Sequence, residues 1–382
     1  MLIEPRACQK IESEVIDRGL CTLCGACVSI CPYFVAYNGR VLARDICDLP
    51  EGRCTDYCPR VSLDLDALNR AVFHTPYDWT EMGTMLAVLM ARPADRKARE
   101  RAQDAGTVST LMRFALDEGI IDSAVVTFFE DKKFPEARTV SEGEALLLSS
   151  GSSYMATPVL EAFNLAVREP DRKRVGLVAT PCQTLALAKM RTSESEKQKG
   201  IDKLSLVIGL FCTWALSYPA FGEFLEQEIH EPIMKYKIPP PPANVLQVFT
   251  SKGETDLPLE RIMPFVRPGC AMCHDMTSEF ADISVGAVEF ADTPVGIGRK
   301  EGSSWNTVII RTESGMRLLD AARSKGIIET DRLPSQILTH LKTAARNKKK
   351  RAIQNIIQRS RSREDLLFLK ADPSKTGTLL DE

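Results

Sequence analysis

The segment CTLCGACVSICP, at residues 21–32, holds four of the twelve cysteines of this 382-residue chain. Two residues separate Cys21 from Cys24 and Cys24 from Cys27, three residues then precede Cys31, and Pro32 follows it. Such short gaps let one tight loop direct three thiolates toward a common point, which is typical of 4Fe–4S ligation. The segment therefore predicts that the chain binds iron through sulfur.

A second run of cysteines repeats the end of the first. The sequence CDLPEGRCTDYCP, at residues 47–59, also closes with cysteine, three residues, cysteine and proline. In two-cluster bacterial ferredoxins, the cysteine before the proline ligates the cluster of the other run. By this logic Cys58 completes a first 4Fe–4S cluster with Cys21, Cys24 and Cys27, whereas Cys31, Cys47 and Cys54 serve a second cluster.

The second cluster lacks one cysteine ligand in this scheme. Cys8 is the unassigned thiol nearby, and the alternatives are a carboxylate such as Asp48 or Glu51, or a three-iron cluster. Structural zinc also binds pairs of cysteines that are two residues apart. Two successive gaps of two residues followed by Cys-Pro fit zinc poorly, so iron–sulfur is the interpretation that we favour.

The composition is that of an ordinary globular chain, with 44% hydrophobic and 26% charged residues. A formal net charge of -2 provides no global attraction for nucleic acid, and we exclude that class of function. The first residues have no signal-peptide pattern, and the longest apolar stretch, Leu204–Leu216, is shorter than the roughly 20 residues that span a bilayer. We therefore expect a cytoplasmic protein without a transmembrane segment, whose reduced cysteines bind metal rather than form disulfides.

The distribution of cysteines and hydrophobic runs predicts three regions. Eight cysteines precede residue 59, so residues 1–70 are expected to form a ferredoxin-like iron–sulfur module. Between residues 80 and 335, β-branched runs alternate with amphipathic helical segments, which predicts an α/β domain with a hairpin insertion at 238–265. Residues 336–382 are predicted to form a basic helix and a frayed tail, in which Lys342–Arg351 is a solvated helix face rather than a docking patch.

The last four cysteines follow predicted strands or turns of the larger domain. Cys182 lies in VGLVATPCQTLAL (175–187), Cys212 ends LVIGLFC (206–212), and Cys270 and Cys273 lie in PGCAMCHD (268–275). Because α/β proteins place their sites at the carboxyl edge of the sheet, these four thiolates are expected to converge there. His274 is either a donor to a cluster sulfur or a surface histidine.

In this part the sequence resembles the family of beta subunits of coenzyme F420-reducing hydrogenases and F420-dependent dehydrogenases. The resemblance covers about residues 84–350 and rests on ATPCQ (179–183), GLFC (209–212), CAMCHD (270–275), ADISVG (281–286) and WNTVIIRT (305–312). It implies an FAD-binding fold whose own 4Fe–4S cluster is held by Cys182, Cys212, Cys270 and Cys273. Some relatives resemble fusions with a two-cluster ferredoxin module in front, as residues 1–60 would be here.

The resemblance also implies flavin contacts. An FAD pyrophosphate binds where a glycine-bearing turn opens a helix, because unpaired N–H groups and the helix dipole favour an anion there. The implied contacts are Ala105, Gly106, Thr107, Ser109, Gly151, Ser152, Ser153, Tyr154, Trp305, Asn306 and Thr307. Ala105 stands where many relatives have a second glycine. Without the resemblance, these segments are ordinary helix caps and a buried tryptophan at a strand start.

Together these features predict an iron–sulfur flavoprotein oxidoreductase subunit. FAD would exchange hydride with coenzyme F420 or a similar carrier, and three 4Fe–4S clusters would connect it to a partner subunit of a dehydrogenase, hydrogenase or heterodisulfide-reductase-like complex. One alternative is a non-catalytic electron-transfer subunit that connects a ferredoxin or sister enzyme to a larger complex. Another is a scaffold whose clusters only stabilise the fold.

Overall fold

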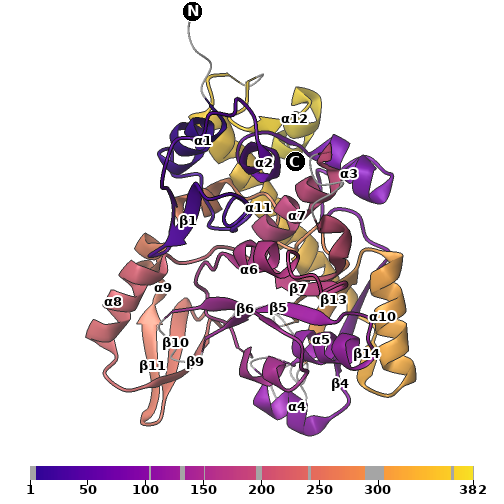
Figure 1. Cartoon of the computed structure of the whole chain (residues 1–382). Coiled ribbons are helices and arrows are strands. Elements are labelled where there is room, and N and C mark those ends of the chain that lie inside the picture. Colours follow the sequence, from indigo (N-terminus) through magenta and orange to yellow (C-terminus); the bar gives the residue numbers. More distant parts are fainter. Residues whose placement is uncertain are drawn as a thin grey trace, which may run out of the picture.

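A mixed sheet of eight strands, in the order β14-β4-β13-β12-β8-β7-β5-β6, is the centre of the computed structural model (Figure 1). The structure describes residues 6–102, 105–129, 134–149, 151–194, 200–239, 242–288, 305–362 and 365–381. The strands are β4 (Ala87–Pro93), β5 (Ser123–Phe128), β6 (Glu136–Val140), β7 (Val175–Ala179), β8 (Leu204–Leu210), β12 (Ile283–Ala287), β13 (Asn306–Ile310) and β14 (Ile328–Asp331). Strands β5, β7, β8 and β12 pair in parallel, which gives the sheet one common carboxyl edge.

Helices cover both faces of this sheet. Alternate residues of β13 show the two layers: Val308 and Ile310 pack in one hydrophobic cluster, and Ile309 packs in another with Leu341 and Ala345. The first face carries α5 (Thr107–Asp117) and α10 (Glu313–Ser324), and the second carries α6 (Val159–Ala166), α7 (Pro181–Thr192) and α11 (Ser335–Arg359). The predicted α/β fold class is confirmed.

The insertion forms a small sheet of its own. It has the order β11-β10-β9, from β9 (Ile233–Lys237), β10 (Val245–Thr250) and β11 (Gly253–Pro258). Phe221 of α8 (Tyr218–Glu228), Tyr236, Leu246 and Ile262 of α9 (Leu259–Ile262) are buried in its hydrophobic cluster. The predicted hairpin is the β10-β11 pair, and β9 adds a strand that the sequence analysis did not predict.

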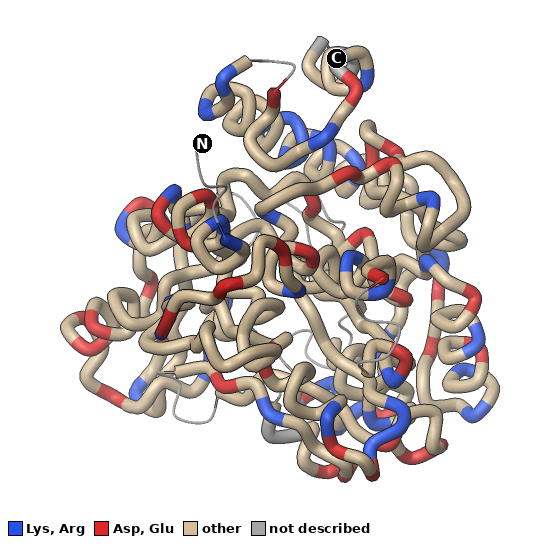
Figure 2. The backbone as a smooth tube through the Cα atoms, turned by 45° about the horizontal axis from the view of Figure 1, so that its top comes forward, with Lys and Arg blue, Asp and Glu red and all other residues tan. Residues whose placement is uncertain are grey.

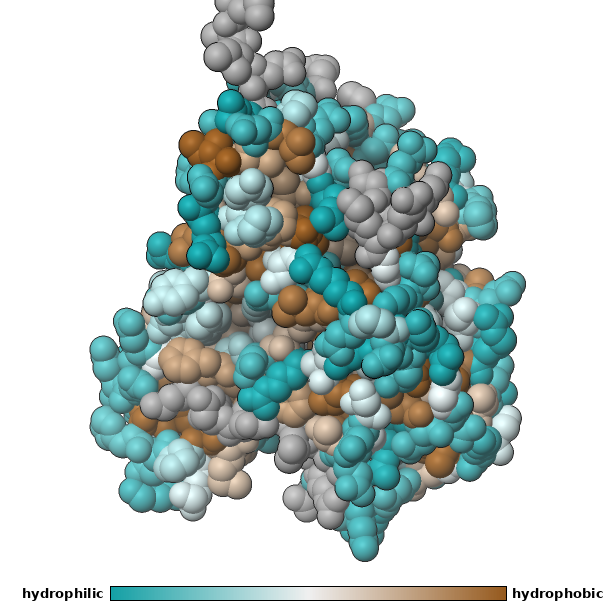
Figure 3. Space-filling model, viewed as in Figure 1, coloured by the Kyte–Doolittle hydropathy of each residue, from teal (hydrophilic) through white to brown (hydrophobic). Residues whose placement is uncertain are grey.

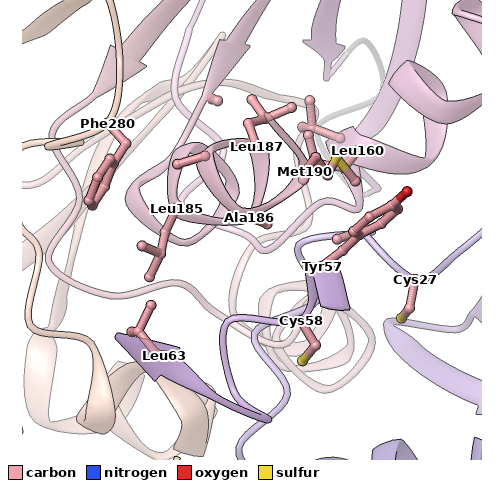
Figure 4. Packing of buried hydrophobic residues seen from close by; sticks show 14 of the residues in the cluster. Cys27, Tyr57, Cys58, Leu63, Leu160, Leu185, Ala186, Leu187, Met190 and Phe280 are labelled. Carbon is pink, nitrogen blue, oxygen red and sulfur yellow. The ribbon is translucent and has the colours of Figure 1, made fainter. Parts of the chain in front are cut away.

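The cysteine-rich module is built from short elements. They are α1 (Ala7–Lys10), the π-helix η1 (Ile11–Ile16), β1 (Phe34–Tyr37), β2 (Arg40–Ala43), α2 (Arg53–Tyr57), β3 (Leu63–Asp64) and α3 (Leu65–Phe73). The module shares one hydrophobic cluster with α6 and α7. Figure 4 shows Tyr57, Cys58 and Leu63 of the module beside Leu185 and Met190 of α7. The iron–sulfur module is therefore packed directly on the helical layer of the sheet.

The basic run on α11 is not a fully solvated face, contrary to the sequence prediction. Lys348 is 5% exposed and Lys349 is 0% exposed. Helix α11 packs beside the turn η6 (Pro268–Met272). The Lys348 Nζ donates to the carbonyl oxygen of Cys212 at 2.6 Å, and the Lys349 Nζ donates to that of Asp78 at 3.0 Å.

The predicted frayed tail is also wrong for the described residues. Strand β15 (Leu369–Lys370) pairs in parallel with β3, and α12 (Pro373–Asp381) follows it. Leu369 and Leu379 are buried in the cluster that the cysteine-rich module shares with α7. The segment after α11 thus returns to the iron–sulfur module and completes its packing.

Candidate redox site

Four cysteines border a cavity in the N-terminal module. Its lining contains Cys21, Cys24, Cys27 and Cys58, together with Ile11, Val15, Ile16, Thr22, Gly25, Ala26, Val41, Pro59 and Arg60. The loop lies close to α6, since the Leu160 N–H donates to the Cys24 carbonyl oxygen at 3.1 Å. Gly25 makes this approach possible, because it has φ +88° and a Cβ there would lie 2.7 Å from the backbone nitrogen of Glu161. A ring of four sulfurs around a largely apolar cavity fits a cysteine-ligated cluster.

Burial holds three thiols of this first set, those of Cys24, Cys27 and Cys58, in the protonated form. Burial raises the pKa of Cys24 and of Cys27 well above the usual value. Burial also raises the pKa of Cys58 to about 11, while the nearby Lys189 and Arg60 act in the opposite direction. Because iron binds thiolate, metal binding here has to displace protons, and the positive iron supplies the charge that burial otherwise disfavours.

A second set joins Cys8 to Cys31, Cys47 and Cys54. The Cys47 N–H donates to the Cys8 sulfur at 3.0 Å. Burial, followed by the neighbouring thiols of Cys31 and Cys47, raises the pKa of Cys54 to about 12. The carboxylate of Asp48 instead pairs with Arg6 and is 87% exposed, and Glu51 is exposed. The structure therefore places Cys8, rather than either carboxylate, against Cys47 of this set.

The third set lies at the carboxyl edge of the sheet. Cys182 is in the first turn of α7, directly after β7, where Thr180 and Gln183 form a capping box. Cys212 follows β8, the parallel neighbour of β7. The turn η6 brings Cys270 and Cys273 to the same place, since the Cys212 N–H donates to the Met276 carbonyl at 2.9 Å.

Burial and neighbouring thiols raise the pKa values of Cys212 and Cys270 in this third set as well. Burial, followed by the thiol of Cys182, raises the pKa of Cys270 to about 11. Burial raises the pKa of Cys212, and the ammonium of Lys348 opposes that rise. In return, the thiols of Cys273 and Cys212 help raise the pKa of Lys348 against the effect of its burial. Lys348 is a partner of this set that the sequence analysis missed.

The first and third sets are neighbours. The thiol of Cys182 is close enough to Cys24 to contribute to the raised pKa of Cys24, after burial itself. Within the described ranges, no three His, Cys, Asp or Glu side chains are arranged to hold a single metal ion. The structure places Cys182 of the third set close to Cys24 of the first.

His274 is buried, which corrects the interpretation as a surface histidine. It is 2% exposed, and neither ring nitrogen has a hydrogen-bond partner among the described residues. Burial, followed by the nearby Lys349, lowers its pKa well below the usual value, so the ring is neutral. Its ring contacts Tyr77 edge-on, with 6.1 Å between centroids.

The first group of implied flavin contacts meets at the N-terminus of α5. Gly106 has φ +88°, and the Thr107 N–H donates to the Asn306 Oδ1 at 3.3 Å. The Thr107 hydroxyl donates to the carbonyl oxygen of Ala91, near the end of β4, at 3.0 Å. Ala105 and Thr107 are buried, whereas Ser109 is half-buried. The structure therefore brings residues 105–107 together with Asn306. The N–H and the hydroxyl of Thr107 already donate to protein acceptors, so they are not free to donate to a flavin phosphate in this structure.

The neighbouring residues of β13 are held by local contacts. The guanidinium of Arg92 lies over the Trp305 ring, 4.2 Å from its centroid. The Thr307 hydroxyl donates to the Ala287 carbonyl oxygen at 3.3 Å. Trp305 is half-buried. The interpretation of Trp305 as a buried tryptophan at a strand start is therefore only partly correct.

The remaining implied contacts are Gly151, Ser152, Ser153 and Tyr154, and Tyr154 lies near the loop that follows Cys212. The Tyr154 ring is 6.5 Å from that of Trp214, which follows Cys212 by two residues. The Tyr154 hydroxyl oxygen accepts from the Ile238 N–H at 3.2 Å, and the Ser153 Oγ accepts from the Met155 N–H at 3.3 Å. This segment is thus tied to the insertion and to the loop after β8.

Arg60 and Lys189 were also missed, although they surround the end of the first set. Lys189 on α7 donates from its Nζ to the carbonyl oxygen of Cys58 at 2.8 Å. Arg60 follows Cys58-Pro59 directly, and this position beside a ligand was the available signal. Acidic and basic residues are otherwise intermixed over the described chain, as Figure 2 shows.

The chain combines a ferredoxin-like cysteine-rich segment with an α/β sheet that carries further cysteines. This combination defines an iron–sulfur protein of the oxidoreductase class. The family model of the 4Fe-4S binding domain matches residues 14–35. The models of the coenzyme F420 hydrogenase/dehydrogenase beta subunit match residues 88–164 with their N-terminal part and 172–336 with their C-terminal part. The chain belongs to the family of coenzyme F420 hydrogenase/dehydrogenase beta subunits.

Individual relatives agree with this assignment. The coenzyme F420 hydrogenase subunit beta of Methanothermobacter thermautotrophicus is 32% identical over 285 residues, which cover 73% of this chain and 96% of that one. The corresponding beta subunit of the coenzyme F420 hydrogenase of Methanosarcina barkeri is 28% identical over 251 residues, which cover 65% of this chain and 82% of that one.

A solved structure also matches. A chain in the F420-reducing [NiFe] hydrogenase complex from Methanosarcina barkeri has a TM-score of 0.63 and 26% identity, with 73% of this chain and 95% of that chain covered. These relatives are named as subunits of hydrogenases or come from a hydrogenase complex, which supports the oxidoreductase class for this chain. None of its described helices is long and apolar enough to cross a membrane.

Proposed function

We propose that this chain is an iron–sulfur flavoprotein subunit that exchanges electrons with coenzyme F420, or a similar carrier, at FAD. Three 4Fe–4S clusters, one for each cysteine set, would conduct the electrons to a partner subunit. A bound flavin accepts an electron pair as hydride and releases the electrons singly, which suits a site beside a cluster chain. The names of the relatives support F420 as the carrier.

The observation that carries this proposal is the place of the third cysteine set. Its cysteines are adjacent to the first set through Cys24 and Cys182, and to the implied flavin segment through Tyr154 and Trp214. The chain itself would hold the clusters in apolar surroundings, keep water from them and fix their order. No side-chain acid or base is needed for single-electron transfer, so positioning and charge are the contributions of the protein.

The second set would be the exit toward the partner. Tyr37, Leu42, Ile46 and Leu49, which lie on β1, on β2 and around Cys47, are large hydrophobic residues that are exposed. On the face shown in Figure 3, hydrophobic side chains lie in separate patches between hydrophilic ones, including over the N-terminal module. Exposed apolar side chains beside a cofactor are suited to contact with another subunit.

A second candidate function is a subunit without flavin that only passes electrons between partners. The partners of Thr107 favour it, since its N–H bonds to Asn306 and its hydroxyl bonds to Ala91. In this case the α5 N-terminus would be an ordinary capped helix.

The deciding experiment is purification of the full chain without oxygen, followed by measurement of iron, acid-labile sulfide and flavin per chain. Reduction by reduced F420, NADPH and reduced ferredoxin is then followed by visible absorbance. The proposal predicts iron for three clusters, one flavin and reduction by reduced F420. Clusters without flavin, reduced by ferredoxin alone, would support the second candidate. A colourless protein without sulfide would contradict both.

A further inference from the structure

Arg60 is a buried cation between two of the cysteine sets. It is 3% exposed and lines the cavity that Cys21, Cys24, Cys27 and Cys58 border. It follows Cys58 by two residues, and its hydrogen bonds reach the turn η6, which carries Cys270 and leads into Cys273. One guanidinium therefore faces the first and the third set together.

The hydrogen bonds of Arg60 connect the same two sets. Its Nη1 donates to the Met272 carbonyl oxygen at 3.0 Å, and its Nη2 donates to the Gly269 carbonyl oxygen at 3.3 Å. These carbonyls flank Cys270 and Cys273 in η6. The guanidinium also lies over the ring of Phe368, 4.7 Å from its centroid. The side chain is thus fixed on three sides.

One N–H donor of Arg60 has no acceptor among the described residues. Its Nε is buried and has no hydrogen-bond partner among the described residues, and none of the described carboxylates forms an ion pair with it. An unpaired buried charge is unfavourable, because the ion loses its hydration. A 4Fe–4S cluster held by four thiolates is an anion, and its potential depends on nearby charge and on hydrogen bonds to its sulfurs. Such a cluster would supply the missing partner.

We propose that Arg60 is a positioning residue that sets the reduction potentials of the first and third clusters together. This inference rests on the proposed function. When one electron moves between these clusters, the donor cluster is oxidised by one unit and the acceptor is reduced by one unit. The total negative charge is unchanged, and Arg60 stabilises the added electron on either side. Because Arg60 would lie beside both clusters, it would attract the transferred electron before and after the transfer.

The test is a potentiometric titration of the full, iron-loaded chain, followed by electron paramagnetic resonance. Arg60→Gln is expected to lower both potentials, with at least a tenfold smaller reduced fraction at a fixed potential, which corresponds to about 59 mV for one electron. Arg60→Lys keeps the charge and is expected to restore most of the difference. The second cluster is expected to be unchanged in both variants.

Arg311→Met is the matched control. Arg311 is 1% exposed and donates to Ser284, Met82, Thr84 and Thr277, without contact to a cysteine. It is expected to lower stability without moving the two potentials. Normal iron content with unmoved potentials in Arg60→Gln would overturn the inference alone. Loss of the first cluster in both Arg60 variants would assign a structural role and overturn it too. Wild-type protein without iron would overturn the proposed function itself.

Discussion

The ammonium of Lys348 donates a hydrogen bond to the main-chain carbonyl oxygen of Cys212, with 2.6 Å between Nζ and oxygen. Lys348 belongs to a run of basic residues on α11 that looks solvated in the sequence, yet its side chain is buried beside Cys212, Cys270 and Cys273. A cation at this distance from a thiolate set has a direct electrostatic effect on whatever the set binds. The charge of Lys348 should therefore be measurable in the redox properties of the bound group.

Replacing Lys348 by methionine is expected to lower the reduction potential of the third cluster. The change removes a positive charge while keeping most of the side-chain volume, so the added electron loses a favourable interaction and the reduced fraction at fixed potential falls about tenfold. Redox titration with paramagnetic detection measures it. Lys350→Met, on the same helix and half-exposed, is the control. Equal shifts in both variants would contradict a specific role for Lys348.

Cys8→Ala is expected to remove the fourth ligand of the second cluster. The Cys8 sulfur accepts a hydrogen bond from the Cys47 N–H, whereas Asp48 points away toward Arg6. Iron per chain should fall, or a three-iron signal should appear in the paramagnetic resonance spectrum. Asp48→Asn should leave both measurements unchanged. The reverse result would assign the ligand to the carboxylate.

Gly106→Ala is expected to lower both stability and flavin content. Gly106 has φ +88°, where alanine costs about 1–2 kcal/mol, and the new Cβ would lie 2.9 Å from the Cβ of Ala102. Gly119→Ala at the other end of α5 provides the comparison, since Gly119 has φ +65° and open space around it. Thermal unfolding and flavin per chain are measured for both. If flavin is lost equally, the α5 N-terminus has no special role in binding it.

Stability is expected to depend on pH through Glu279. This residue is buried, accepts from the Tyr77 hydroxyl at 2.5 Å, and pairs with Lys349 at 3.1 Å. Burial raises the pKa of Glu279 to about 7, from an ordinary value of 4.5. The folded state therefore holds a proton that the unfolded state releases between these values. The free energy of unfolding should fall as pH rises through this window.

The measurement is urea unfolding of the iron-loaded chain at about pH 5 and about pH 7.5. Glu279→Gln should remove most of the fall. Glu260→Gln, at an exposed position, should keep it. A fall of the same size in wild type and Glu279→Gln would show that another group causes the pH dependence.

The sequence predicted the features that depend on local pattern. Cys182 and Cys212 were expected at the ends of neighbouring strands, because β-branched runs before them favour parallel strands with a shared carboxyl edge. The spacing of Cys21, Cys24 and Cys27 predicted one surrounding loop. The family assignment from motifs such as residues 305–312 is confirmed by the models that match residues 88–164 and 172–336. The domain boundaries, the ligand sets and the cytoplasmic location stay predictions.

The sequence could not show what tertiary packing does to polar residues. Lys348 and Lys349 have the composition of a solvated helix face, and only tertiary contacts, such as those with Cys212 and Asp78, show that they are buried. The sequence also left open whether His274 is buried or at the surface, because that too depends on tertiary packing. The two-residue strand β15 has too little pattern to predict, because its partner β3 is far away in the sequence.

The pairing of Leu63 with Leu369 has a consequence for biosynthesis. A ribosome makes β3 long before β15, and domains begin to fold while synthesis continues. Strand β3 therefore lacks its partner β15 while the α/β domain between them is synthesised. This pairing can form only after residues 369 and 370 have emerged.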